Sequence, residues 1–151
     1  ALTQRLSELD DSNSALYQER AQDFLSRWQL ALESWQQKAE PLRDMPTVVY
    51  HDAWLYLTAW LGLRQLAELE PKPGIAPTSA HLSGVLKLMQ TQPARVIIRS
   101  PYQDPRASEW LHRHTEIPER VLPYTVGGNV QATDLFGLFD STLELLLQVA
   151  P

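Results

Sequence analysis

Apolar residues recur at helical spacing along the N-terminal part of the chain. Leu2, Leu6 and Leu9 form a short stripe, which stops at a polar cluster at residues 10–14. That cluster offers side chains able to cap a new helix. Beyond it, apolar positions three and four apart continue on one face: Tyr17, Ala21, Phe24, Trp28, Ala31, Trp35 and Ala39. We predict one amphipathic helix of about 28 residues, ending near Pro41, with its aromatic stripe in a core.

After Pro46 the pattern changes to short β-branched runs that alternate with helical stripes. We predict strands at residues 47–50, 65–70, 94–98 and 121–124. We predict helices at residues 53–61, 81–90, 106–114 and 132–149. This βαβαβαβα order requires a parallel sheet with helices on both faces. The predicted fold class is therefore α/β, a four-stranded parallel sheet flanked by helices and preceded by one long helix.

The charge and the cysteine count exclude several kinds of function. The chain carries 13 Lys and Arg against 18 Asp and Glu, and its pI is near 5.3. That balance, without a basic stripe, argues against a nucleic-acid partner. The absence of cysteine excludes thiolate catalysis and cysteine-type zinc sites, so a transition-metal site would need histidine and carboxylate ligands. The chain opens in what reads as the middle of a helix, and we expect it to be a piece of a longer protein.

His51 and Asp52 follow the first predicted strand directly and form the main candidate site. Ligands of open α/β sheets bind just beyond the carboxyl ends of the strands, and a neutral imidazole there is a common metal ligand. Asp52 could orient His51 or cap the next helix. The alternative is that His51 is only a half-buried polar residue and Asp52 only a cap. One histidine cannot hold zinc alone, because zinc sites use four ligands.

The other candidate residues favour structural roles. His112 and His114 are two apart on a predicted helix and point in different directions, whereas shared chelation needs a spacing of four. His81 falls in the first turn of a helix, where we expect it on the surface. Ser100 is followed by Pro101 and lacks the Gly-x-Ser-x-Gly pattern of a nucleophile. The Gly-Gly pair at residues 127–128 does not form a phosphate-binding motif.

Four segments, in this order, resemble a known family: LDDSNSALYQERAQDFLSRW, VVYHDAWLYLTAWLGL, LEPKPGIAPTSAHLSGVLKLM and ARVIIRSPYQDPRASEWL. They look like the second half of the periplasmic zinc and manganese receptors of ABC importers, the zinc-uptake or adhesin-lipoprotein family. The Tyr-His-Asp-Ala turn and the Glu-Pro…Pro-Thr-Ser loop are the most specific parts. The resemblance implies two lobes joined by a rigid backbone helix. Residues 1–45 would hold the end of a preceding helix and that interlobe helix, and residues 46–151 the C-terminal lobe.

The resemblance also implies a ligand set for the metal. The family takes two histidines from its N-terminal lobe, which this chain lacks, and a third ligand at the position of His51. A fourth ligand, often Asp, follows the last strand, where residues 122–128 here contain no carboxylate. Asp134 and Asp140, in the closing helix, would be poor substitutes. Three histidines and a water molecule suit Zn2+ better than Mn2+, which favours carboxylate oxygens.

The implied function is binding, without enzymatic activity. The resemblance implies a periplasmic receptor that captures Zn2+, or less readily Mn2+, between its lobes and delivers it to an ABC permease in the inner membrane. Its partners would be the ion, the permease and the missing N-terminal lobe, and the isolated chain could form a homodimer that covers its bare cleft face. The alternatives are a flavodoxin-like enzyme or signalling domain with a His51-Asp52 site, and a helical interaction protein.

Overall fold

Alternating apolar strands and amphipathic helices in the sequence produce an α/β fold. The computed structural model describes residues 1–72 and 74–150. The chain divides into two compact units, Ala1–Gln37 and Lys38–Pro151. Among the described residues, none of the helices is both long enough and apolar enough to cross a membrane.

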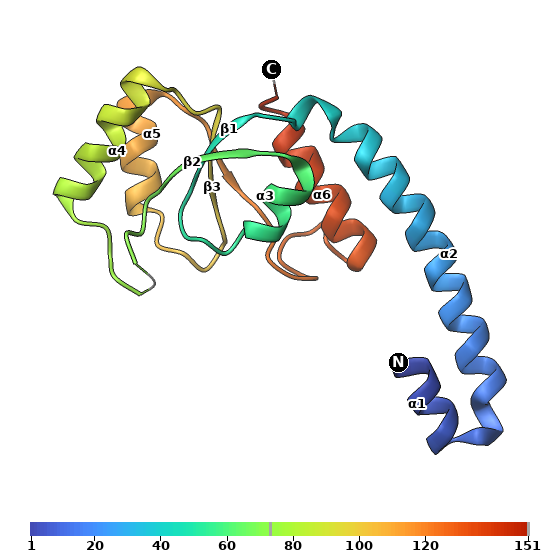
Figure 1. Ribbon diagram of the computed structural model, residues 1–151. Coiled ribbons are helices and arrows are strands. Elements are labelled where there is room, and N and C mark those ends of the chain that lie inside the picture. Colours follow the sequence, from blue (N-terminus) through green and yellow to red (C-terminus); the bar gives the residue numbers. More distant parts are fainter. Residues whose placement is uncertain (73, 151) are drawn as a thin grey trace. The chain divides into compact units, whose positions relative to one another are not determined.

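The first unit is built from two helices, which follow the apolar stripes of the sequence. Helix α1 spans Leu2–Leu9, and α2 spans Ser14–Lys38, a helix of 25 residues (Figure 1). The predicted long helix is thus confirmed, and it ends just before a 3₁₀ turn at Glu40–Leu42 that contains Pro41. Phe24 stacks on Trp28 at 5.7 Å between ring centroids, and Trp28 meets Trp35 edge-on at 5.1 Å. These rings contact one another along the helix, but the prediction that the stripe lies in a core is wrong for most of it: among the described residues of α2 only Trp35 is buried, and Phe24 is exposed.

Asp10 organises the connection between α1 and α2. Its carboxylate accepts hydrogen bonds from the Tyr17 hydroxyl at 2.7 Å, the Ser12 hydroxyl at 2.7 Å and the Asn13 amide at 2.8 Å. These donors, Tyr17 foremost, favour the charged form and lower the pKa of Asp10 from 3.8 to about 2. The polar cluster at residues 10–14 therefore closes this turn through one ionised side chain.

The second unit contains a four-stranded parallel sheet in the order β2-β1-β3-β4. The strands are β1 (Pro46–Val49), β2 (Arg64–Glu68), β3 (Val96–Arg99) and β4 (Glu119–Val121). The helices are α3 (Leu55–Leu61), α4 (Ser79–Thr91), α5 (Arg106–Thr115) and α6 (Leu135–Leu147). Figure 1 shows α4 and α5 on one side of the sheet and α3 and α6 on the other. The predicted fold class is confirmed.

The central strands β1 and β3 are buried on both faces, which explains their continuous β-branched sequences. Val48 and Ile97 belong to a core cluster that also contains Leu69, Val85, Met89 and Leu111. Their neighbours along the strands, Val49 and Ile98, are fully buried as well. Side chains alternate between the faces of a strand, so these pairs fill opposite sides of the sheet. Each such side chain contributes about 1.5–3 kcal/mol by leaving water.

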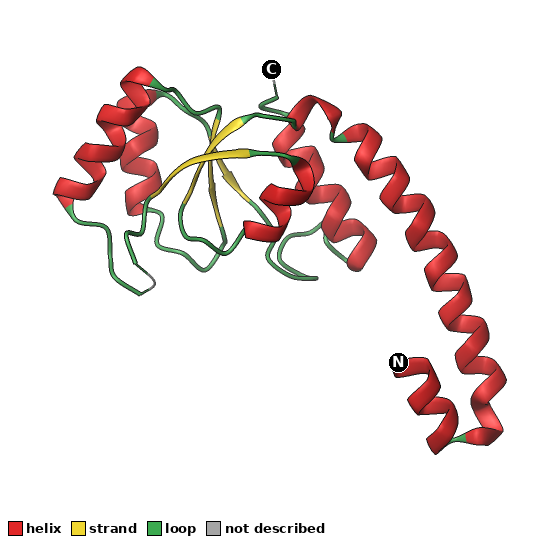
Figure 2. Cartoon of the chain, viewed as in Figure 1, coloured by secondary structure: helices red, strands yellow, loops and turns green. Residues whose placement is uncertain are grey.

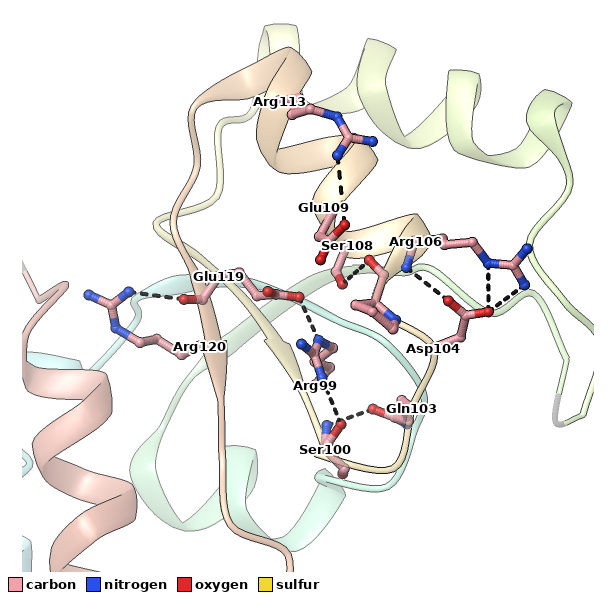
Figure 3. A network of polar contacts seen from close by, with 11 residues as sticks. Arg99, Ser100, Gln103, Asp104, Arg106, Ser108, Glu109, Arg113, Glu119 and Arg120 are labelled. Atoms are coloured by element: carbon pink, nitrogen blue, oxygen red, sulfur yellow. Dashed lines mark hydrogen bonds and ion pairs between the residues drawn. The ribbon is translucent and has the colours of Figure 1, made fainter. Parts of the chain in front are cut away.

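The fourth strand begins earlier than the predicted range of 121–124. Residues 119–121 pair with residues 97–99 of β3, and the Leu122 N–H donates to the Arg99 carbonyl at 2.9 Å. Pro123 follows and has no N–H to continue the ladder. The strand lies at the sheet edge, and its Glu119 carboxylate accepts from Arg99 Nε at 2.7 Å (Figure 3). Because charged residues form much of this edge strand, the apolar pattern placed it too late.

Capping residues set where the helices begin and end. Thr78 is the N-cap of α4, and its hydroxyl accepts from the His81 N–H at 3.2 Å, which confirms a cap at this turn. Gly62 ends α3 in the left-handed conformation at φ 66°, as its position in the sequence predicted. The Asp134 carboxylate accepts from the Gly137 N–H at 2.8 Å, so α6 begins at Leu135 and not at the predicted residue 132.

The lowered pKa of Asp10 predicts a specific acid sensitivity. Because its pKa is lower in the folded chain, its stabilising effect is present above about pH 4 and is lost as the pH falls through about 2. The natural chain should therefore lose thermal stability as the pH falls through this range, and Asp10→Asn should lose less. Circular dichroism melting curves recorded at several pH values measure the loss. Asp11→Asn in the same turn serves as the control, and an equal effect of both changes would contradict the role given to Asp10.

The cap of α4 predicts a loss of stability on removing one hydroxyl. Thr78→Ala should lower the free energy of unfolding by about 1 kcal/mol, because the His81 N–H loses its acceptor. Chemical denaturation monitored by tryptophan fluorescence measures the change. Ser79→Ala, one residue further on, should alter stability by less than about 0.5 kcal/mol. Indistinguishable midpoints for the two variants would show that the cap contributes nothing.

Candidate metal-binding site

The site lies where strands β1 and β2 end next to each other. Parallel pairing continues past both strands, since the Leu69 N–H donates to Val49 O at 2.9 Å and the Glu70 N–H donates to Tyr50 O at 2.8 Å. His51 follows Tyr50 directly, so this pairing brings Glu70 beside His51. Figure 2 shows the loops after the strands gathered along this edge of the sheet. In parallel sheets this edge is where ligands bind.

His51 and Glu70 form the polar centre of this edge. Nδ1 of His51 lies 3.0 Å from Oε2 of Glu70, and the two side chains are 27% and 15% exposed. The remaining oxygen, Oε1 of Glu70, accepts a hydrogen bond from the Gly74 N–H at 3.0 Å. With Nδ1 turned toward the carboxylate, Nε2 of His51 is the ring nitrogen left to take a ligand.

Sequence reasoning did not single out Glu70, although a signal for it existed. It is the Glu of the Glu-Pro pair that opens the loop after the second strand. The carboxyl ends of neighbouring parallel strands meet at one edge, so a polar residue there was a candidate neighbour of His51. Glu70 was missed because β2 contains few apolar residues, so the sequence did not determine how β2 pairs with β1.

Asp52 plays neither of the roles predicted for it. Its side chain is exposed, the acid beside His51 is Glu70, and the N-cap position of α3 is Trp54, which makes no side-chain cap hydrogen bond. A tight turn explains the difference: the Ala53 N–H donates to the His51 carbonyl at 2.7 Å, which turns Asp52 outward before the helix begins. Asp52 is therefore a surface residue of this turn.

The other histidines are held separately by backbone carbonyls. His81 was expected on the surface but is half-buried, because its Nε2 reaches the Glu68 carbonyl at 2.8 Å. Nδ1 of His112 lies 2.7 Å from Ile117 O, and Nδ1 of His114 lies 2.7 Å from Trp110 O. His112 and His114 lie at the C-terminal end of α5. This end of α5 is on the side where the strands begin, whereas His51 is on the side where they end. These two histidines are structural, in line with the role the sequence favoured.

The loop after β4 carries aromatic rings where the resemblance led us to look for a carboxylate. Tyr124 packs edge-on against Trp54 at 5.8 Å and against Tyr102 at 5.5 Å between ring centroids. Asp134 is used as the cap of α6, and Asp140 forms a 3.8 Å ion pair with Lys38. No group of three or more His, Asp or Glu residues able to hold an ion occurs within residues 1–72 and 74–150.

Ser100 and Asp104, the serine and the acid that follow β3 in the described chain, are both engaged in local contacts. Ser100 is fully buried, and its backbone N–H donates to Gln103 Oε1 at 2.7 Å (Figure 3). Asp104 was the second acid near the strand ends, and it pairs with Arg106, whose Nε lies 2.7 Å away. Hydrogen bonds from Arg106 lower the pKa of Asp104. Asp104 is therefore tied to a cation, and it lines a hollow of about 510 Å³ together with Glu70, Tyr50 and Trp110.

The edge around His51 is rich in exposed apolar side chains. Every exposed large apolar residue described in the second unit lies in a connection that leaves a strand, or in the first turn of the next helix: Leu55, Tyr56, Ile75, Tyr102, Tyr124, Val126, Val130 and Leu135. We call this set the apolar rim. All four connections start from the same edge of the sheet, so the rim surrounds the ends of the strands. Apolar surface concentrated in this way marks an interaction site.

Comparisons with known proteins identify the family of this chain. The family model described as "Zinc-uptake complex component A periplasmic" matches residues 1–149. The high-affinity zinc uptake system protein ZnuA of Brucella abortus (strain 2308) is 21% identical over 105 residues, which are 70% of this chain and 31% of that protein. Curated relatives such as this one are therefore matched over about a third of their length.

Solved structures share the fold at low sequence identity. A crystal structure of ZnuA superposes with a TM-score of 0.82 at 17% identity, over 99% of this chain and 54% of that one. The receptor FpvC of Pseudomonas aeruginosa in complex with Mn2+ gives a TM-score of 0.70 at 19% identity, over 97% of this chain and 57% of that one. The chain thus spans about half of these proteins. From the family match over residues 1–149, it belongs to the family of periplasmic zinc-uptake complex component A proteins.

Proposed function

We propose that this chain is the C-terminal half of a two-lobe metal receptor and that Nε2 of His51 is its ligand to the ion. The observation that carries the proposal is the position of His51: it stands at the carboxyl end of the central strand β1, with Nδ1 turned to Glu70. Membership of a zinc-uptake family and coverage of about half of the related structures support a site shared with a second lobe.

The donor set favours Zn2+ as the cargo. His81 also lies near the end of β2, but its Nε2 is held by the Glu68 carbonyl, which leaves His51 as the described histidine available here. The carboxylates of Asp104, Asp134 and Asp140 are engaged by other groups. Two histidines from the missing N-terminal lobe and one water molecule would complete a four-coordinate site, which Zn2+ accepts. Mn2+ prefers more oxygen ligands, and this edge offers it few.

The receptor would bind and release its ion without transforming it. Ser100, the serine that directly follows β3, is buried, and a coordinating imidazole is sufficient for capture. We place the protein in the periplasm, as the family description suggests, where it would pass Zn2+ to an ABC permease in the inner membrane. Residues 1–45 would form the backbone helix with the end of the helix before it, and residues 46–151 the C-terminal lobe.

The apolar rim supports the presence of a covering partner. Tyr56 is 91% exposed and Val130 is 85% exposed, and both follow the carboxyl ends of strands. The N-terminal lobe would cover this surface in the receptor, and its approach would exclude water from the site. In its absence we propose that two copies of the chain cover the rim of each other, because a large apolar surface in water is costly.

Replacing His51 tests the ligand assignment. In the two-lobe receptor that contains this chain, His51→Ala should weaken Zn2+ binding by about 100-fold or more, because one of three nitrogen ligands is lost. Competition against a chelating fluorophore measures the affinity, with Mn2+ titrated in parallel and expected to bind less tightly. His112→Ala is the matched control, because that imidazole lies at the opposite edge. Unchanged affinity in His51→Ala would refute the site, and tighter binding of Mn2+ would refute the choice of ion.

The state of association of the isolated chain tests the role of the rim. Sedimentation velocity at increasing concentration should show a dimer, and Tyr56→Glu should shift it toward the monomer by placing a charge in the contact. Lys87→Glu, an exposed change on α4 away from the rim, should leave association unchanged. A chain that stays monomeric over the whole concentration range would show that the rim does not pair with itself.

A further inference from the structure

We infer that Glu70 is the positioning residue of the metal site: it holds Nδ1 of His51 so that Nε2 alone is presented to the ion. The inference rests on the proposed role of His51 as a ligand and adds a second residue to the site. Its basis is the 3.0 Å approach of the two side chains and the way in which the fold fixes the carboxylate.

Glu70 is held at both its backbone and its side chain. Its N–H donates to the Tyr50 carbonyl at 2.8 Å, which extends the pairing of β1 with β2 to the residue next to His51. Its Oε1 accepts from the Gly74 N–H at 3.0 Å, and the loop closes on itself where the Ile75 N–H donates to Lys72 O at 3.0 Å. The second oxygen, Oε2, is thereby directed at the imidazole.

Nδ1 of His51 depends on the Glu70 carboxylate as its hydrogen-bond acceptor. The atom is shielded from solvent, and within the described part of the chain it makes no hydrogen bond of ordinary geometry. Oε2 of Glu70 lies within hydrogen-bond distance of it, so a small rotation of the ring would align the Nδ1–H with the oxygen. A buried N–H without an acceptor is unfavourable, which favours that alignment.

The consequence is a fixed tautomer. A neutral imidazole carries one proton, and a carboxylate at Nδ1 stabilises that proton there and leaves the lone pair on Nε2. The ring is also held in one orientation before the ion arrives, so less conformational freedom is lost on binding. Glu70 would act on the affinity for the ion through His51, without touching the ion.

Only a carboxylate can accept from both neighbours. The Gly74 N–H is always a donor, and the imidazole donates from Nδ1 in the required tautomer. A glutamine at this position has one oxygen and one NH2 group, so one of the two donors would face another donor. If its oxygen stays on Gly74, its NH2 group faces Nδ1, and the proton of the ring is driven to Nε2, where it blocks the ion.

The tautomer can be measured on the 151-residue chain without any metal. Long-range 1H–15N NMR at mildly alkaline pH, where histidine is neutral, distinguishes protonated from unprotonated ring nitrogens. We expect His51 to be protonated on Nδ1 in the natural chain and to gain the Nε2–H form in Glu70→Gln. Glu68→Gln, two residues earlier, should leave the spectrum of His51 unchanged, since that carboxylate pairs with Gln65 at 2.9 Å. A natural chain with the Nε2–H form would overturn the inference.

The affinity of the two-lobe receptor for Zn2+ gives the second measurement. Glu70→Gln should weaken binding about 10- to 100-fold, less than His51→Ala, and Glu68→Gln should not change it. Equal affinity in Glu70→Gln and the natural protein, with binding lost in His51→Ala, would overturn the role of Glu70 alone. Unchanged binding in His51→Ala would instead overturn the proposed ligand. Far-ultraviolet circular dichroism of each variant confirms that the fold is retained.

Discussion

The parallel pairing of β1 with both of its neighbours is the constraint on which the rest of the second unit depends. Val48 and Val49 are fully buried on opposite faces of the sheet, so β1 cannot shift by one residue without exchanging its two apolar faces. The same pairing continues to Tyr50 and Glu70 through the 2.8 Å hydrogen bond between them. The position of His51 relative to Glu70 is therefore set by the core packing of the sheet.

The sequence predicted best those parts in which one physical signal dominates. Continuous β-branched runs located β1 and β3, and the predicted end of α3 at residue 61 agrees with the structure. The edge strand β4 was placed too late because Glu119 and Arg120 occupy half-buried positions that look polar in sequence. Edge strands need only one apolar contact face, so periodicity locates them poorly.

The site was predicted in part for a related reason. His51 could be identified because it follows an unambiguous strand, whereas Glu70 follows a strand whose pairing with β1 the sequence did not determine. The roles predicted for Asp52 failed because a three-residue turn, closed by the 2.7 Å hydrogen bond from the Ala53 N–H to His51 O, leaves the Asp52 side chain exposed before α3 begins. Side-chain direction in a tight turn depends on such backbone bonds, which a pattern of residue types does not contain.

A metal site divided between two lobes must bind its ion tightly when the lobes close and release it when they separate. The residues at the carboxyl ends of the strands are suited to both requirements. In the proposed receptor each half must bind the ion weakly alone, so that separating the lobes releases it, yet both must bind it tightly together. One imidazole gives the weak half, and joining the lobes raises the effective concentration of the remaining ligands without new contacts. The affinity of the closed receptor for the ion then depends on how well each ligand is oriented before the lobes close. Conformational freedom that a ligand loses on closure lowers this affinity. A half-buried carboxylate tied to Gly74 supplies that orientation without adding a ligand that would hold the ion after the lobes part.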